Sequence, residues 1–323
     1  MSAQETGGVV AAPAARPPAA GDAQPPRSSA KRVLLILLAV WLGGIVLLAV
    51  VYGIHGHRNH AFEPQNEFKL DTWVNLGVFS INKAVMYLVL AAVATCLTMI
   101  YIARRMQQRP NKVQAAVEVL FTLMRDNITG SAMDDKMAAK WFPFIGTLFL
   151  FIMFSNLIGY IPLPTNTEHE ITVFGMQIPS FSLYAATANL SIPLALALVV
   201  FISYTVEGVR AKGPIGYLKG LVPGGVTGGM AVFIFFLEVL SNLMRLMSLS
   251  IRLFANILAG HLIILFMAGA LAVILGISAL GWFTIPFGIL LFAFEVGLVA
   301  ALQAFIFATL TAIYLGGAVA EEH

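Results

Sequence analysis

Long apolar runs, separated by short segments that contain charge, Pro or Gly, cover most of the chain. The first run, 33–52, is long enough to cross a hydrocarbon core of about 30 Å as a helix. Five further runs are 73–103, 141–161, 187–206, 229–270 and 272–315. Hydrophobic residues make up 59% of the sequence and charged residues 11%, far from the balance of soluble domains. The pattern predicts an all-α polytopic membrane protein with about six membrane helices, of which the C-terminal ones are long and tilted.

The N-terminal part of the chain differs from the rest. Residues 1–30 are rich in Ala, Pro, Gly and Ser and show no apolar periodicity, which is typical of a disordered tail. Segment 31–53 begins with two basic residues and is predicted to be an additional N-terminal membrane helix. A cleaved signal peptide is the alternative, but no small-residue cleavage site follows Val51. The single cysteine, Cys96, is predicted to be a small buried hydrophobic residue.

The loops differ in charge, and this difference predicts the orientation of the chain. The loops after the second and the fourth run carry many Lys and Arg residues, whereas 162–184 carries none. Because basic loops stay on the cytoplasmic side, we expect 162–184 to face outward and both termini to be cytoplasmic. In the first basic loop, Val113, Val117, Leu120 and Met124 recur at helical spacing, which predicts a cytoplasmic amphipathic helix on the membrane surface.

Arg252 lies in the middle of the fifth run, where a guanidinium that cannot be deprotonated is costly. At about 100° per residue, several polar residues fall within about 40° of it on one helix. This polar stripe consists of Glu238, Ser241, Arg245, Ser248, Arg252 and Asn256. Such a stripe either holds helices together or lines an ion path, and two Arg with one Glu exceed what helix packing requires.

The last two runs contain three further polar residues of interest. His261 is nine residues beyond Arg252, which places it on the opposite helix face and roughly 14 Å nearer the outer surface. Glu295 and Gln303 lie roughly 12 Å apart along the final run, with Glu295 toward the outside. An intramembrane Glu is either protonated or solvated by a polar channel, so we expect His261 and Glu295 to exchange protons. A neutral core Glu and a hydrogen-bonded core His are the alternative.

Two segments carry a resemblance to a known family. SLSIRLFANILAGH at 248–261 and LQAFIFATLTAIYL at 302–315 closely resemble the signature regions of ATP synthase subunit a, the stator of the membrane motor. The resemblance covers most of 73–323, including NLIGYIP at 156–162 and the GPIGYLKG loop. It implies a subunit a-like membrane domain at 73–323 in a bacterial plasma (inner) membrane. The additional helix and the tail are not shared.

The resemblance also implies roles for particular residues. Arg252 is expected to be the essential stator arginine, which faces a ring of c subunits and separates two offset proton half-channels. Gln303 matches the family glutamine near the arginine. Asn256 and Arg245 match the polar positions that flank it, and Glu238 is expected to line the inner half-channel.

The chain departs from the family pattern on the outer side. Glu295 lies one residue away from the acidic position usual in relatives, and a local helical bulge would explain the offset. Where relatives commonly read T-A-D-L-N, this chain has Asn189 and Ser191, which bind water but do not relay protons by ionising. We therefore expect His261 and Glu295 to carry more of the outer relay.

These features predict an ion-translocating subunit of a rotary ATP synthase, with protons favoured over sodium. The expected partners are c-ring subunits, peripheral-stalk b subunits and other synthase subunits within the lipid bilayer. The alternatives are a secondary transporter whose Arg252 binds an anionic substrate and a scaffold whose polar stripe only joins helices. Since the sequence has no nucleotide-binding Gly-rich loop, ATP formation is expected in partner subunits. No cofactor or metal is predicted, and the net charge of +3 gives no sign of nucleic-acid binding.

Overall fold

A computed structural model of the chain describes residues 27–52, 72–76, 79–105, 112–173, 176–222, 224–267, 274 and 276–319. Most of the predicted tail and the C-terminal residues 320–323 lie outside the described residues. Six described helices are long and apolar enough to cross a membrane. Their candidate spans are Lys31–Val51, Lys83–Arg104, Asp135–Ile158, Ser191–Lys212, Gly229–Leu265 and Ala279–Val319. The predicted all-α polytopic membrane fold is therefore confirmed.

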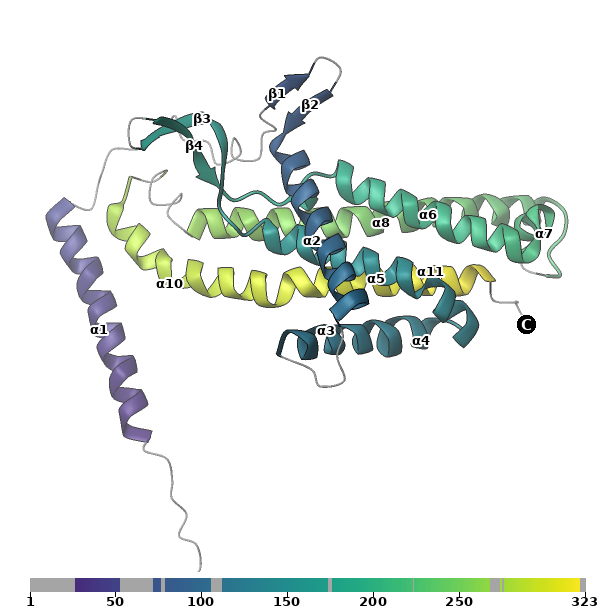
Figure 1. Ribbon diagram of the computed structural model, residues 1–323, viewed down its shortest axis with the longest axis horizontal. Helices are drawn as coiled ribbons and strands as arrows, with labels where there is room; N and C mark the ends of the chain where they lie inside the picture. The colour runs from purple at the N-terminus through teal and green to yellow at the C-terminus, as the bar shows by residue number, and fades with distance from the viewer. Residues whose placement is uncertain are drawn as a thin grey trace, which may run out of the picture.

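The helices follow the apolar runs closely. In chain order they are α1 (Arg27–Tyr52), α2 (Lys83–Arg105), α3 (Lys112–Thr122), α4 (Gly130–Ala132), α5 (Asp135–Ile158), α6 (Ser191–Lys212), α7 (Pro214–Lys219), α8 (Gly229–Leu265), α10 (Ser278–Phe294) and α11 (Ala300–Val319). Two π-helical segments, η2 (Leu123–Thr129) and η5 (Glu295–Val299), and the 3₁₀ turn η3 (Ala186–Ala188) complete the helical structure that is described. In Figure 1, α5, α6, α8 and α11 run along the long axis, whereas α1 and α2 cross it.

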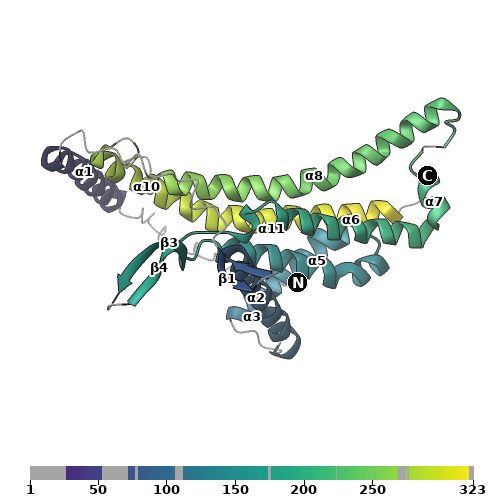
Figure 2. The ribbon, with the colours of Figure 1, turned by 90° about the horizontal axis from the view of Figure 1, so that it is seen from above.

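The helix α8 is much longer than a perpendicular membrane crossing requires. Its 37 residues extend over roughly 55 Å, compared with a hydrocarbon core of about 30 Å. Figure 2 shows α8 as a curved helix that runs beside α10 and α11. A helix of this length fits the membrane only when it is strongly tilted, as predicted for the C-terminal helices.

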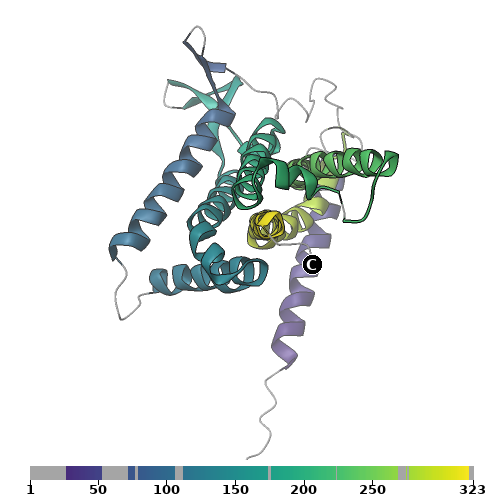
Figure 3. The same ribbon diagram turned by 90° about the vertical axis from the view of Figure 1, so that its right-hand side faces the viewer.

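Two antiparallel hairpins were not predicted. The strands β1 (Thr72–Leu76) and β2 (Phe79–Asn82) form one, and β3 (Leu163–Val173) and β4 (Met176–Ser182) form the other. The prediction of one apolar helix over 73–103 was thus wrong at its start, because the Asn82 side chain accepts a hydrogen bond from the Val85 N–H (3.0 Å) and begins the helix there. Both hairpins lie on one side of the molecule and α3 on the opposite side (Figures 1 and 3).

The helix predicted in the first basic loop is present as α3 and η2. Its Met124 is buried against the bundle, whereas Val119 is exposed. The cytoplasmic position of this helix stays a prediction. Cys96 on α2 is exposed, so the prediction that it is buried was wrong, because in a membrane protein an apolar run also faces lipid.

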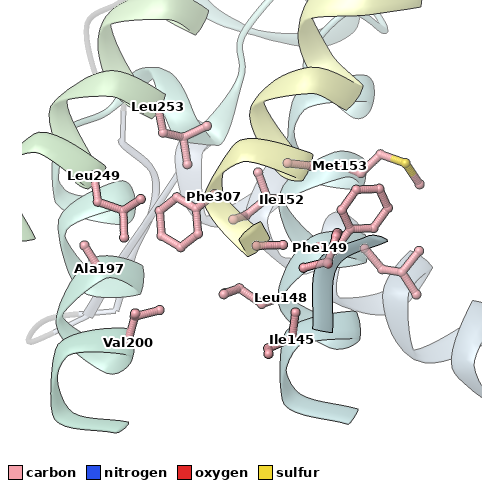
Figure 4. Close-up of a cluster of buried hydrophobic side chains, with 14 of the residues drawn as sticks. Ile145, Leu148, Phe149, Ile152, Met153, Ala197, Val200, Leu249, Leu253 and Phe307 are labelled. Carbon is pink, nitrogen blue, oxygen red and sulfur yellow. The ribbon is translucent and has the colours of Figure 1, made fainter. Parts of the chain in front are cut away.

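The hydrophobic core lies where α5, α6, α8 and α11 meet (Figure 4). Phe307 of α11 lies between Leu249 and Leu253 of α8 and the α5 side chains, as the close-up shows. One ion pair ties the bundle together, from Lys140 of α5 to the buried Glu207 of α6. This packing holds α8 against α11 and so fixes the surroundings of Arg252.

Candidate functional site

The polar stripe lies on the exposed face of α8. Arg245, Ser248, Arg252 and Asn256 are exposed, and Glu238 and Ser241 are partly exposed. An adjacent face of the same helix segment, which carries Leu249, Leu253 and Ile257, is buried. The polar side chains of the stripe are therefore incompletely covered by the described helices. A stripe that only joined helices would be buried between them.

Arg252 has few partners within the described chain. Its Nη2 donates to the Ser248 hydroxyl at 3.5 Å, and its guanidinium is not within ion-pairing distance of any described carboxylate. Across from it on α11 lies Gln303, which is 6% exposed and lines the same narrow cleft. The remaining residues of the cleft are Leu249, Leu253, Ile306 and Phe307. The structure thus brings together the arginine and the glutamine that the sequence singled out.

A second group of polar residues lies where α8 approaches the end of α5. His261 is 4% exposed, and its ring nitrogens lie 3.0 Å from the Ile257 carbonyl oxygen and 3.3 Å from the Gly159 carbonyl oxygen. The Tyr160 ring stacks on the His261 ring with centroids 4.5 Å apart. His261 therefore lies between two backbone carbonyl groups, to one of which a neutral ring donates, and is packed by an aromatic ring.

Glu295 completes this group, which we call the Tyr160 cluster (Tyr160, His261 and Glu295). The Tyr160 hydroxyl donates a hydrogen bond to Glu295 Oε2 at 3.0 Å. Burial, together with the Glu295 carboxyl, raises the pKa of Tyr160, so the hydroxyl stays a donor at neutral pH. The carboxyl group lies directly over Gly260, where a Cβ atom would overlap it. Three segments distant in the chain thus meet at one carboxyl group.

The helix at Glu295 is locally widened. Residues Glu295–Val299 form the π-helical segment η5 between α10 and α11. A π-helical turn contains an extra residue and rotates the side chains on either side of it relative to a regular α-helix. A bulge of the kind expected from the offset of Glu295 is therefore present at that residue.

Two buried polar side chains, near the Tyr160 cluster in the chain, join the elements that carry it. Asn156 donates to the Ala300 carbonyl oxygen at 3.2 Å and accepts a hydrogen bond from the Thr187 hydroxyl at 2.7 Å. These contacts tie α5 and η3 to the start of α11. Both side chains are fully buried, so their hydrogen bonds fix the geometry strongly.

Asn189 and Ser191 occupy a different position. The Asn189 side-chain oxygen accepts from the Ser191 N–H at 3.0 Å, at the start of α6. Within the described residues, no hydrogen bond joins either of them to Tyr160, His261 or Glu295. Their predicted role in ion translocation stays a prediction, and the structure shows them in the turn that begins α6.

A cavity of about 430 Å³ lies toward the other end of α8. We call it the Arg245 cavity. It is lined from α8 by Glu238, Asn242 and Arg245, and from other elements by Tyr204, Lys212, Tyr217, Gly220, Leu221, Ile313, Tyr314, Gly317 and Ala318. Polar groups from α6, α7, α8 and α11 thus surround one open space.

Arg245 has three neighbours in this cavity. Its Nη2 lies 3.5 Å from Glu238 Oε1, and its Nη1 donates to Asn242 Oδ1 at 3.3 Å. Its guanidinium carbon lies 5.8 Å from the centre of the Tyr314 ring, within the range of a cation–π contact. Both ion-pair partners are more than one-third exposed, so the pair is accessible to water.

Tyr160, Asn156 and Tyr314 are site residues that were not predicted from the sequence. The first two belong to the segment NLIGYIP at 156–162, which attracted attention only for its resemblance to relatives. Asn156 and Tyr160 are four residues apart, so in a helix they share one face, and this spacing was an available signal. Tyr314 lies in an apolar run and gives no such sign.

Comparison with known proteins agrees with this geometry. The family model described as ATP synthase A chain matches residues 85–316. The ATP synthase subunit a of Rubrobacter xylanophilus is 36% identical over 238 residues, which cover 73% of this chain and 83% of the relative. Those of Bradyrhizobium diazoefficiens and Pelagibacter ubique are 32% and 33% identical over 81% of this chain and 99% and 100% of their own lengths. The chain therefore belongs to the ATP synthase A chain family.

Proposed function

We propose that this chain is the ion-translocating stator subunit of a rotary ATP synthase and that Arg252 separates two offset proton half-channels. The observation that carries the proposal is the exposed Arg252 guanidinium beside Gln303, with the Tyr160 cluster on one side of it along α8 and the Arg245 cavity on the other. The relatives are named subunit a of ATP synthase, which supports the same function.

Arg252 acts on a carboxylate that comes from outside the chain. We expect this carboxylate to belong to a c subunit, because the Arg252 side chain is exposed and has no described acidic partner. A fixed positive charge lowers the pKa of an approaching carboxyl group, so the group releases its proton beside Arg252. The same charge repels protons, which prevents direct leakage between the two half-channels.

The Tyr160 cluster serves as the proton entry in this proposal. Glu295 accepts a proton from the outer side and passes it toward the rotor, while Tyr160 holds its carboxyl group in place. His261 stabilises the position of Tyr160 through their stacked rings. A cluster in which hydrogen bonds hold the side chains in place passes a proton between fixed groups and needs no wide water-filled channel.

The Arg245 cavity serves as the proton exit. Its volume of about 430 Å³ accommodates many water molecules, and its walls carry groups that bind them. Lys212 and Tyr217 line it from the basic loop that is predicted to be cytoplasmic. A proton released beside Arg252 therefore reaches the cytoplasm through water rather than through a chain of buried side chains.

Rotation follows from the unequal access of the two paths. A neutral carboxyl group enters lipid at low cost and an ionised one does not, so each c subunit leaves Arg252 only after protonation. The membrane potential contributes about 2.3 kcal/mol per charge per 100 mV. We propose that c-ring and peripheral-stalk b subunits are the partners, and that the complex lies in a bacterial inner membrane with both termini cytoplasmic.

The test is ATP-driven proton pumping in inverted membranes that contain Arg252→Ala. We expect an assembled complex that does not pump, because nothing then holds the carboxylate or blocks the leak. The matched control is Ile251→Ala, which shortens the exposed neighbouring side chain and leaves the charge unchanged. Pumping at the normal rate by an assembled Arg252→Ala complex would refute the proposed function.

A further inference from the structure

The helix α1 lies outside the part of the chain that matches the family. The family model begins at residue 85, and relatives matched over 99% and 100% of their own lengths account for 81% of this chain. Figures 1 and 3 show α1 at the edge of the molecule, at a steep angle to the bundle and away from α2, α3 and α5. Among the described elements α1 packs mainly on α10. The helix α1 is therefore an addition to the part of the fold that the family model matches.

The contact between α1 and α10 is centred on a reciprocal pair of tryptophans. The Trp41 indole N–H donates to the Trp282 carbonyl oxygen at 3.1 Å, and the Trp282 indole N–H donates to the Trp41 carbonyl oxygen at 3.0 Å. The Trp41 ring also stacks on Phe283 at 5.2 Å and meets the edge of Phe287 at 6.4 Å. In lipid, two such hydrogen bonds and an aromatic cluster define one register of the two helices.

A glycine one turn along α1 makes this close approach possible. A Cβ atom at Gly44 would overlap the Trp282 indole, whereas a Cβ atom at Gly43 would have no described atom within 4 Å. Small residues at helix contacts in membranes let the helices approach closely. Gly44 is therefore part of the contact surface, and Gly43 faces away from it.

Among the described elements, α1 is the one that α10 contacts most extensively, ahead of η5 and α8. Along α10, Phe283, Phe287, Ile289 and Leu290 are exposed even with α1 in place. The first half of the last span therefore lies outside the main bundle, and α1 is the element that fixes its direction.

The direction of α10 determines where Glu295 lies. The helix α10 ends at Phe294, and Glu295 is the first residue of η5. Near this junction Phe292 of α10 meets the Tyr160 ring edge-on at 5.8 Å. The partly exposed carboxyl group is confined on two sides, by Gly260 and by the Tyr160 hydroxyl. A small change in the angle of α10 therefore changes the Tyr160–Glu295 distance.

We infer that α1 is a positioning helix for proton entry: through the Trp41–Trp282 pair it holds α10 so that the Glu295 carboxyl group meets Tyr160. This inference rests on the proposed function and assigns a role to an element outside the family model. Trp41, Gly44 and Trp282 are positioning residues, since none of them touches the transferred proton.

The ionisable surroundings of Glu295 make its protonation a suitable readout. Tyr160, from the turn after α5, and His261 of α8, stacked on Tyr160, are the titratable groups that lie at Glu295, whereas Arg252 of α8 lies further along that helix. The elements α10, η5 and α11 carry no other charged residue. The dependence of proton conduction on outer pH therefore reports on this one hydrogen-bonded group.

The experiment compares Gly44→Leu with Gly43→Leu in the full chain within the assembled complex, reconstituted in liposomes. Passive proton conduction through the membrane sector is driven by a potassium diffusion potential and measured over a series of outer pH values. We expect Gly44→Leu to lower conduction about threefold and to move the half-maximal pH upward, since Glu295 loses its donor. Gly43→Leu adds the same side chain on the free face and should match the original chain.

A second comparison separates positioning from a general loss of stability. If α1 acts through the Tyr160 hydrogen bond, Gly44→Leu causes no further pH shift in a chain that already carries Tyr160→Phe. Equal shifts in both backgrounds overturn the inference. Identical pH profiles for Gly44→Leu and Gly43→Leu overturn it as well.

A milder variant covers the case in which Gly44→Leu does not assemble. Trp282→Phe keeps an aromatic ring and removes one indole donor, so we expect a smaller shift in the same direction. If proton conduction by Trp282→Phe depends on outer pH as it does in the unsubstituted chain, the inference is overturned. Normal pumping by Arg252→Ala, in contrast, refutes the proposed function itself, so the two failures are distinguishable.

Discussion

The Tyr160 cluster and the Arg245 cavity lie on opposite sides of Arg252 along α8, and they hold their polar groups differently. In the cluster the His261 ring is buried, and each polar group has a partner within 3.3 Å. In the cavity the ion pair between Arg245 and Glu238 measures 3.5 Å, and both side chains are more than one-third exposed. One region is a hydrogen-bonded network built on the buried Tyr160 and His261, and the other is an open, water-accessible space.

Under the proposed function, this difference means that fixed side chains transfer the proton on one side of Arg252 and water transfers it on the other. Buried polar groups are costly when a partner is lost, so a hydrogen-bonded network depends on each member. In an open cavity water replaces a lost partner at little cost. Substitutions of similar size should therefore have large effects in the Tyr160 cluster and small effects in the Arg245 cavity.

The largest effect is expected for Glu295→Gln. The substitution keeps the shape of the side chain but removes the group that binds the proton, so passive proton conduction should fall about a hundredfold. Conduction through the reconstituted membrane sector measures this effect. Glu295→Asp, which keeps a carboxyl group, is the control and should retain part of the activity. If Glu295→Gln conducts protons at the normal rate, the Tyr160 cluster is not the site of proton entry.

The next largest effect is expected for Tyr160→Phe. The ring still stacks on His261, but Glu295 loses the donor at 3.0 Å, and a hydrogen bond to a charged group changes an equilibrium by about tenfold or more. Because the donor favours the charged carboxylate, the pH of half-maximal conduction should move upward. A titration of conduction against outer pH measures the shift. A profile that does not move would show that the bond plays no part in proton entry.

A much smaller effect is expected in the Arg245 cavity. Glu238→Gln breaks the ion pair with Arg245 at a site that water reaches, so conduction should change by about twofold. The change should shrink further at high salt, because exposed charges are screened. Conduction assays at low and high ionic strength test both statements. A loss as large as that of Glu295→Gln would contradict the contrast between the two regions.

No effect on conduction is expected from Lys140→Met, although stability should fall. Removal of Lys140 leaves the buried Glu207 carboxylate without its cation, at a cost of about 1–3 kcal/mol. The dissociation temperature of the complex measures the loss. The double variant Lys140→Met with Glu207→Met should recover most of it, because no charge is then buried alone. A double variant no more stable than the single one would show that the pair is not the cause.

The sequence predicted the helices well because lipid leaves the backbone few choices. A segment that crosses the membrane satisfies its own hydrogen bonds as a helix, so an apolar run translates almost directly into a span. The start of α2 was missed because Thr72–Leu76 forms a hairpin with Phe79–Asn82. Strand pairing depends on contacts between two segments, whereas the pattern of apolar runs describes each segment by itself and does not predict such contacts.

The candidate site was predictable where its residues share a helix and less so elsewhere. The angular relation of Arg252 to the polar stripe follows from helix geometry, and the exposed face of α8 agrees with it. Tyr160 was missed because its partners His261 and Glu295 lie 101 and 135 residues further along. An aromatic residue at the end of an apolar run gives no sign of such contacts. The packing of α1 on α10 was missed for the same reason.

Gly260 carries a consequence for how this chain tolerates change. The Glu295 carboxyl group fills the space that a side chain at position 260 would occupy. The site therefore requires the absence of a side chain at position 260 as much as it requires a carboxyl group at position 295. Among random variants, nearly every replacement of Gly260 should be selected against, whereas its exposed neighbour Ala259 should vary freely. A larger residue at position 260 therefore requires a second change, one that moves or shortens the side chain at position 295.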